Sequence, residues 1–166
     1  INNILNKAQV NEIPVHFAAV GSALQLDDDV SISILSPPAN LLKGTRSDMN
    51  NNCLVMLLEY GNITILLTGD IEEEMQTRLV QGGNLRPVDV LQAPHHGSRY
   101  FSPSFFEQAN PKVAVISVGA SNAFDFPSGE IISLLEQIGA LVYRTDRDGA
   151  VIIYTDGNKI KIETGR

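Results

Sequence analysis

Two β-prone runs separated by only two residues constrain the fold of this chain most strongly. Residues 54–60 and 63–68 are largely apolar, and Gly61-Asn62 joins them. Gly and Asn tolerate the positive φ angles of tight turns, so the pattern predicts an antiparallel hairpin. Because neither run alternates between apolar and polar residues, we expect a sheet that is covered on both faces.

The rest of the chain changes repeatedly between strand-like and helix-like periodicity. Further strands are expected at residues 30–35, 88–93, 113–118, 141–144, 150–154 and 160–162, the last two as a hairpin. Helices are expected at residues 71–81, 103–109 and 128–138. In the first helix, Ile71, Met75 and Leu79 form one apolar stripe, and Asp70 with Glu73 has the spacing of a capping box. The order predicts a single α/β domain over residues 1–166.

Composition narrows the chemistry of this domain. The chain has 166 residues and a net charge of −7, which argues against a large phosphate-binding face of Lys and Arg. Its single cysteine, Cys53, excludes an internal disulfide framework and a cysteine-rich zinc site. No run of 18 apolar residues is present to span a membrane. We therefore look for a site built from imidazole, carboxylate and small polar side chains.

The first candidate is Asp70, which follows the apolar strand at residues 63–68. A strand end holds a carboxylate in a fixed position at the open edge of a sheet, where ligands commonly bind. The alternative is an ordinary N-cap for the helix that follows. Glu72, Glu73 and Glu74 fall in the first turn of that helix, where the helix dipole favours negative charge.

The second candidate is the pair His95-His96, which lies between Pro94 and Gly97 at another strand end. Neighbouring side chains in extended backbone point to opposite faces, so both can approach one metal only if the turn bends sharply. One imidazole would then coordinate a metal while the other orients it or contacts substrate. The alternative is a pair of loop histidines that are hydrogen-bonded to the backbone.

The third candidate is the loop at residues 117–127, which is rich in small polar residues. Backbone N–H groups at Gly119 and Ser121 are able to bind an anion, but the composition alone favours a plain surface loop. Ser98 beside His96 resembles a hydrolase nucleophile only superficially, because no G-x-S-x-G elbow surrounds it.

Taken in order, these segments resemble the metallo-β-lactamase-like domain of the ComEC family, the DNA-uptake channel proteins of bacterial competence. The resemblance covers about residues 20 to 163. It is carried by LLTGD at 66–70, DVLQAPHHGS at 89–98, AVISVG at 114–119, Asn122, Pro127 and YRTDRDGA at 143–150.

The resemblance implies an αββα sandwich with a metal site at one edge of its two sheets. Asp70 matches the aspartate that bridges two metals, and His95 or His96 matches the later histidine ligand, with His95 slightly favoured as the first residue past the strand. The implied metal is zinc or manganese. Ser98 and Asn122 are the candidates for hydrogen bonds to a phosphate oxygen.

Two departures from the family pattern affect this expectation. The His-x-His-x-Asp-His loop that supplies the other ligands is absent, so we interpret the chain as the C-terminal half of the domain. Relatives also carry a histidine directly before the proline that matches Pro127, whereas this chain has Phe126. We therefore predict that the isolated chain binds metal weakly, shows no useful hydrolysis, and packs poorly over residues 1–20.

The resemblance implies a metal-dependent hydrolase that acts on DNA phosphodiesters during DNA uptake. The implied partners are single-stranded DNA, the upstream half of the domain and the membrane-spanning region of the parent protein, with this domain outside the cytoplasm. One alternative is a degenerate structural or docking domain of the same membrane protein, which Phe126 favours. Another is a stand-alone hydrolase of the same superfamily with a small-molecule substrate. The sequence upstream of this chain distinguishes these three hypotheses.

Overall fold

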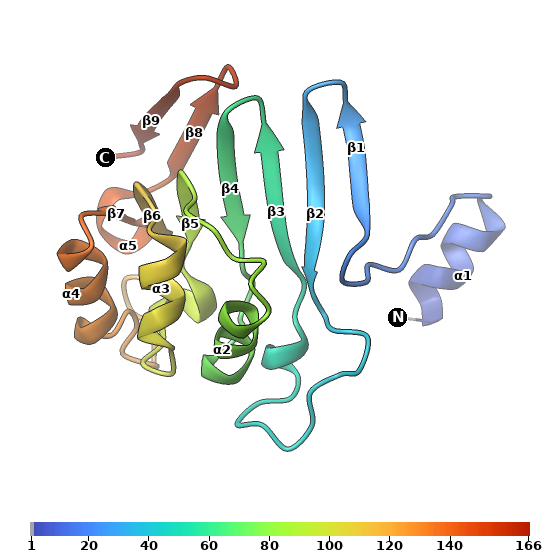
Figure 1. The fold of residues 1–166 in the computed structure, drawn as a ribbon, viewed down its shortest axis with the longest axis horizontal. Coiled ribbons are helices and arrows are strands. Elements are labelled where there is room, and N and C mark those ends of the chain that lie inside the picture. Colours follow the sequence, from blue (N-terminus) through green and yellow to red (C-terminus); the bar gives the residue numbers. More distant parts are fainter. Residues whose placement is uncertain (1) are drawn as a thin grey trace.

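A large mixed β-sheet with helices on one face forms the core of the protein (Figure 1). The computed structural model describes residues 2–166, so Ile1, which the predicted domain includes, lies outside the described residues. The seven strands follow one another across the sheet in chain order. They are β1 (Ala23–Asp27), β2 (Val30–Ser36), β3 (Val55–Tyr60), β4 (Ile63–Leu67), β5 (Val90–Gln92), β6 (Val113–Ile116) and β7 (Leu141–Arg144). Strands β1 to β4 pair antiparallel, and β4 to β7 pair parallel.

Helices connect the parallel strands, and a separate hairpin ends the chain. The α-helices are α1 (Asn2–Val10), α2 (Glu73–Gln81), α3 (Pro103–Ala109), α4 (Gly129–Gln137) and α5 (Thr145–Asp148). Two 3-10 turns are η1 (Asn50–Asn52) and η2 (Pro94–Gly97), and the hairpin pairs β8 (Val151–Thr155) with β9 (Ile160–Thr164). The predicted α/β class is therefore confirmed, as are the two predicted hairpins. No helix among residues 2–166 is long and apolar enough to cross a bilayer.

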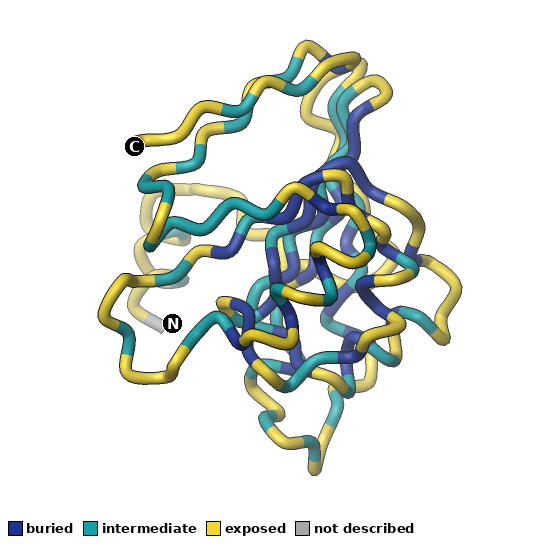
Figure 2. Tube along the Cα trace, turned by 90° about the vertical axis from the view of Figure 1, so that its left-hand side faces the viewer, coloured by how far each residue is buried: buried dark blue, intermediate teal, exposed yellow. Residues whose placement is uncertain are grey.

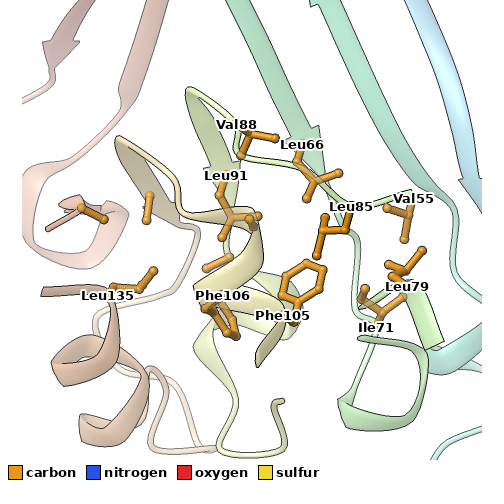
Figure 3. Close-up of a cluster of buried hydrophobic side chains, with 14 of the residues drawn as sticks. Val55, Leu66, Ile71, Leu79, Leu85, Val88, Leu91, Phe105, Phe106 and Leu135 are labelled. Atoms are coloured by element: carbon orange, nitrogen blue, oxygen red, sulfur yellow. The ribbon is translucent and has the colours of Figure 1, made fainter. Parts of the chain in front are cut away.

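The hydrophobic core lies between the sheet and the helices α2, α3 and α4 (Figure 3). Consecutive right-handed crossovers between parallel strands place their helices on the same face of a sheet. The predicted apolar residues Ile71, Met75 and Leu79 are buried, at 0%, 2% and 5% exposed, although Ile71 lies just before α2 begins. They join a cluster that includes Leu66 and Leu91 from the sheet and Phe105, Phe106, Ile131 and Leu135 from the other helices.

The opposite face of the sheet carries apolar side chains that no helix covers. The cross-strand pairs Met56–Leu67 and Leu58–Ile65 lie on this face, and all four side chains are only half-buried. Figure 2 shows the β8–β9 hairpin on this side of the sheet, away from the helices. The expectation of a sheet covered on both faces therefore holds only in part for residues 2–166, because Ile63, Val90 and Val113 on this face are buried whereas these four side chains are not. The second layer of the expected sandwich is present here only as these two strands.

The turn at Gly61-Asn62 joins the two sheets. Asn62 donates its backbone N–H to the carbonyl of Gly157 at 2.7 Å, and its side chain donates to Asn158 Oδ1 at 2.9 Å. Gly61 has a φ of 56°, and a Cβ atom there would lie 2.6 Å from the Gly157 carbonyl oxygen. Only glycine fits this close approach, so the turn residue that predicts the hairpin also positions the second one.

The start of α2 differs from the prediction. The helix begins at Glu73, and the side chain of Asp70 does not cap it. The Oδ1 atom of Asn51 accepts hydrogen bonds from the backbone N–H groups of Glu72 at 3.0 Å and Met75 at 3.2 Å. A fully buried asparagine from the long polar loop thus replaces the predicted capping box and leaves Asp70 free for the sheet edge.

The N-terminal region is largely exposed, although β1 pairs with β2 in the sheet. Helix α1 and strand β1 were not expected from the sequence, and residues 11–29 are exposed throughout. Figure 1 shows α1 beside the β1 edge, separated from the helices that cover the core. The prediction of poor packing over residues 1–20 is confirmed for residues 11–20.

Candidate metal and substrate site

Asp70 and the His95-His96 pair converge at one edge of the sheet, as the sequence predicts. Asp70 follows β4 and the histidines follow β5, which are adjacent parallel strands. The backbone N–H of His95 donates to the carbonyl of Gly69 at 3.1 Å, which ties the two strand ends together. The carboxyl ends of parallel strands meet at one edge, so the topology itself brings these residues into proximity.

The turn that carries the histidines has unusual backbone geometry. His95 and His96 have φ values of 47° and 57°, and Gly97 follows at 78°. Left-handed conformations are costly for residues other than glycine, and they concentrate at functional sites. A Cβ atom on Gly97 would lie 2.5 Å from the Cβ of Pro127, so glycine is required where this turn meets the loop before α4.

His96 faces Asp70 at the open edge. Its Nε2 atom is 3.8 Å from Asp70 Oδ1, and the two side chains are 48% and 43% exposed. Its Nδ1 atom lies 2.7 Å from the carbonyl oxygen of Ser117. A carbonyl oxygen only accepts hydrogen bonds, so Nδ1 carries a proton, and in the neutral imidazole Nε2 then presents its lone pair. This anchored imidazole has the arrangement that metal-binding histidines use.

His95 turns inward instead. Its Nδ1 atom lies 3.2 Å from Oε1 of Glu72, and the two side chains are 22% and 4% exposed. The sequence indicates Glu72 only as a charge in the first helical turn, whereas the structure places it beside a candidate histidine. No local pattern distinguishes Glu72 from its neighbours Glu73 and Glu74 in the sequence.

The loop at residues 117–127 is shaped by Asn122. The side-chain amide of Asn122 donates to the carbonyls of Gly119 and Phe126, and its oxygen accepts from the backbone of Phe124 and Phe126. This loop and His96 line a pocket of about 320 Å³. Ser98 is 2% exposed and accepts a hydrogen bond from the Tyr100 backbone. Contact of Ser98 and Asn122 with a phosphate therefore stays a prediction.

Phe126 packs against both histidines. Its ring centroid lies 5.5 Å from that of His95 and 6.5 Å from that of His96. Within residues 2–166, no group of three or more His, Cys, Asp or Glu side chains is arranged to hold a metal ion. Asp70 and His96 are donors of a suitable kind, but a catalytic zinc site normally has three protein ligands.

Comparisons with known proteins give the family. No protein-family model matches the chain. ComE operon protein 3 of Bacillus subtilis is 31% identical over 149 residues, which are 89% of this chain and 19% of that protein. Recombination protein 2 of Haemophilus influenzae is 32% identical over 123 residues, or 74% of this chain and 15% of that protein. The chain belongs to the ComEC family.

This ComEC chain spans less than a fifth of the length of the relatives that it matches. Among solved structures, a protein described as a metal-dependent hydrolase from Parabacteroides distasonis aligns with a TM-score of 0.55 at 14% identity, over 84% of this chain and 61% of that one. The likeness shows a shared fold. This part of the ComEC protein has a seven-stranded mixed sheet, a layer of helices on one of its faces and a separate two-stranded sheet.

Proposed function

We propose that this ComEC segment supplies Asp70 and a histidine to a metal-dependent site that hydrolyses DNA phosphodiesters. The observation that carries the proposal is the 3.8 Å separation of His96 Nε2 from Asp70 Oδ1, with the imidazole held at Nδ1 by Ser117. Two ligands at about 2.1 Å from one tetrahedral ion lie about 3.4 Å apart, so a small adjustment would let both coordinate the same ion. The relatives are named competence and recombination proteins, which supports DNA as the substrate.

The geometry favours His96 over His95 as the partner of Asp70 in this site. A mixed set of imidazole and carboxylate donors suits zinc and manganese. When bound, such an ion stabilises negative charge on a phosphate and activates water. In this chain, Asp70 provides an open carboxylate, Ser117 fixes the orientation of His96, and Asn122 shapes the adjoining pocket. The remaining ligands are proposed to come from the upstream half of the domain.

The longer relatives suggest the setting of this site. We propose that the parent protein is embedded in the membrane, that this domain lies outside the cytoplasm, and that single-stranded DNA is its partner. The half-buried apolar face of the sheet supports docking of an upstream half-domain there.

A second candidate function is a non-catalytic docking or structural domain. It is favoured by Phe126, whose apolar ring contacts both imidazoles at the position where the family pattern has a histidine. Such a domain would keep the fold and lose metal-dependent hydrolysis.

Two proteins distinguish these candidates: this chain and a version extended upstream through the His-x-His-x-Asp-His loop of the parent. Each is titrated with Zn²⁺ and Mn²⁺ and is assayed on fluorescently labelled single-stranded DNA. We expect weak binding and no cleavage from the short chain, and metal-dependent cleavage from the long one. In the long protein, His96→Ala should reduce cleavage strongly, whereas the matched change at the exposed His16 should not.

Robust cleavage by the short chain would show that the active site is misplaced. Absence of metal-dependent cleavage by a folded long protein would favour the non-catalytic domain.

A further inference from the structure

The proposed metal site leaves one buried carboxylate without a role. Glu72 is 3% exposed although it belongs to the polar end of α2. Burial of a carboxylate is costly unless charged or hydrogen-bonding partners surround it. The partners of Glu72 therefore indicate which interactions compensate for its burial.

These partners come from two other segments of the chain. Asn50 donates a hydrogen bond from Nδ2 to Glu72 Oε1 at 3.0 Å, and Arg46 Nε lies 3.4 Å from Oε2. His95 Nδ1 lies 3.2 Å from Oε1. The direction of this contact misses hydrogen-bond alignment, so His95 Nδ1 is buried without a hydrogen bond. A small rotation of the imidazole would let Nδ1 donate to Glu72 Oε1 and would satisfy this buried nitrogen.

Helix stability does not account for this arrangement. Asn51 already caps the first turn of α2, and the exposed Glu73 provides negative charge near the helix N-terminus. A glutamate that served only the helix dipole would stay in solvent, as Glu73 does. The burial of Glu72 therefore needs another explanation, and His95 is one of the side chains beside it.

We propose that Glu72 is a positioning residue that accepts the Nδ1–H of His95 and leaves Nε2 of that imidazole as the coordinating nitrogen. The inference rests on the proposed metal site and extends it to a second histidine. His96 is held in the same way through its own Nδ1, by the carbonyl of Ser117. A carboxylate on the outer nitrogen fixes the tautomer and ring orientation of a metal-binding histidine.

The same carboxylate ties the polar loop at residues 39–52 to this site. The guanidinium of Arg46 lies 3.0 Å from the ring centroid of Tyr100 while its Nε approaches Glu72. The backbone N–H of Arg46 donates to Glu74 Oε1 at 2.8 Å. Displacement of this loop would therefore shift Glu72 and change its contact with His95.

The imidazole tautomers of the metal-free chain test the proposal directly. Nitrogen-15 NMR in alkaline buffer, where imidazoles are neutral, distinguishes Nδ1–H from Nε2–H. We expect Nδ1–H at His95 and His96, and the solvent-favoured Nε2–H at the exposed His16. A wild-type His95 in the Nε2–H form would overturn the proposal without any variant.

Glu72→Met removes the acceptor, and Glu73→Met removes the same charge one residue away at an exposed position. In the Glu72→Met protein, we expect His95 to return to the Nε2–H form and His96 to keep its tautomer. In the Glu73→Met protein, we expect both histidines to keep the wild-type tautomers. An unchanged His95 in a folded Glu72→Met protein would contradict the proposal. If that variant does not fold, Glu72→Gln keeps an acceptor oxygen and should retain the wild-type tautomer; the Nε2–H form there would also contradict it.

A zinc titration of the same spectra separates this inference from the proposed function. Loss of an outer-shell carboxylate weakens metal affinity about 10- to 100-fold, so Glu72→Met should need correspondingly more Zn²⁺ than Glu73→Met to shift His95. If the two variants need the same Zn²⁺ concentration to shift His95, Glu72 has no metal-orienting role. The expected tautomers without any zinc response at Asp70 and His96 would count against the metal site and support the Glu72–His95 pairing.

Discussion

We expect Phe126 to limit how much metal the proposed site is able to hold. Its ring is adjacent to both imidazoles and offers no nitrogen ligand. Phe126→His would add a third imidazole to the edge that carries Asp70 and His96. We expect the Zn²⁺ affinity of the chain to rise at least about tenfold, because each added ligand replaces water on the ion. Isothermal titration calorimetry measures this change.

Phe124→His is the matched control for this change. Phe124 is 72% exposed and stacks on Phe126 from the solvent side. A histidine there adds the same side chain to the same loop without joining the pair of imidazoles. Equal gains from the two variants would show that position 126 has no special relation to the site.

Asp89 gives the fold a dependence on pH. Burial raises the pKa of this carboxyl, but hydrogen bonds from Lys112 and Thr64 outweigh that effect and hold the pKa below its ordinary value of 3.8. The folded state therefore binds the proton less tightly than the unfolded state. The stabilisation is complete above the ordinary value and is lost as the pH falls through the lower folded pKa.

Asp89→Asn should accordingly reduce the free energy of unfolding by about 2 kcal/mol at pH 7, as expected for charge-assisted hydrogen bonds to a buried group. The difference from wild type should shrink at acid pH, where the wild-type carboxyl is also protonated. Urea denaturation at several pH values measures it. Lys112→Met should cost less, because the Lys112 side chain is 78% exposed.

Individual site residues differ in how far the sequence predicts them. Asp70 and His96 are recognisable because each follows an apolar strand, and parallel pairing of those strands brings them together. Which histidine faces Asp70 depends on the left-handed turn at residues 95–97, and no local pattern encodes its direction. Glu72 is inaccessible to such reasoning, because its burial depends on a loop more than 20 residues upstream.

At the scale of elements, the polar loop at residues 39–52 acts as an external cap for α2. Asn51 is fully buried, accepts from two backbone N–H groups of the helix and donates to Glu74 Oε2 at 2.9 Å. Asn51→Ala should destabilise the protein by about 1–3 kcal/mol, because it leaves those buried donors unpaired. Asn40→Ala, an exposed change in the same loop, should have an effect within about 0.5 kcal/mol. Thermal unfolding of both variants measures the difference.

Helix α2 also shows which features a local sequence pattern predicts and which it does not. The apolar periodicity of α2 depends on its own residues, and it correctly predicts the buried stripe. The start of the helix depends on a residue from another loop, so the predicted capping box at Asp70 is wrong. Strand β1 is exposed along its length and carries no buried face that a pattern would reveal.

At the scale of the whole molecule, the two edges of one sheet face are exposed. Leu24 in β1 and Leu141 in β7 lie at these edges and are 50% and 62% exposed. Exposed apolar surface promotes association. The double change Leu24→Thr, Leu141→Thr should therefore reduce self-association of the chain at high concentration, with little loss of stability.

Static light scattering against protein concentration measures that association. Leu41→Thr is the control, since Leu41 is 55% exposed but lies in the polar loop. A reduction of equal size from Leu41→Thr would mean that general surface polarity, and not the sheet face, governs association.

The strand order also has a consequence for the way the protein is made. Every strand of the large sheet pairs with the strand that precedes it in the chain. A nascent chain can therefore add one strand at a time as it leaves the ribosome, without waiting for a distant partner. The β8–β9 hairpin is the exception, because Asn158 must return to Asn62, which is 96 residues earlier. We expect that closure to follow the formation of the edge that carries Asp70 and the histidines.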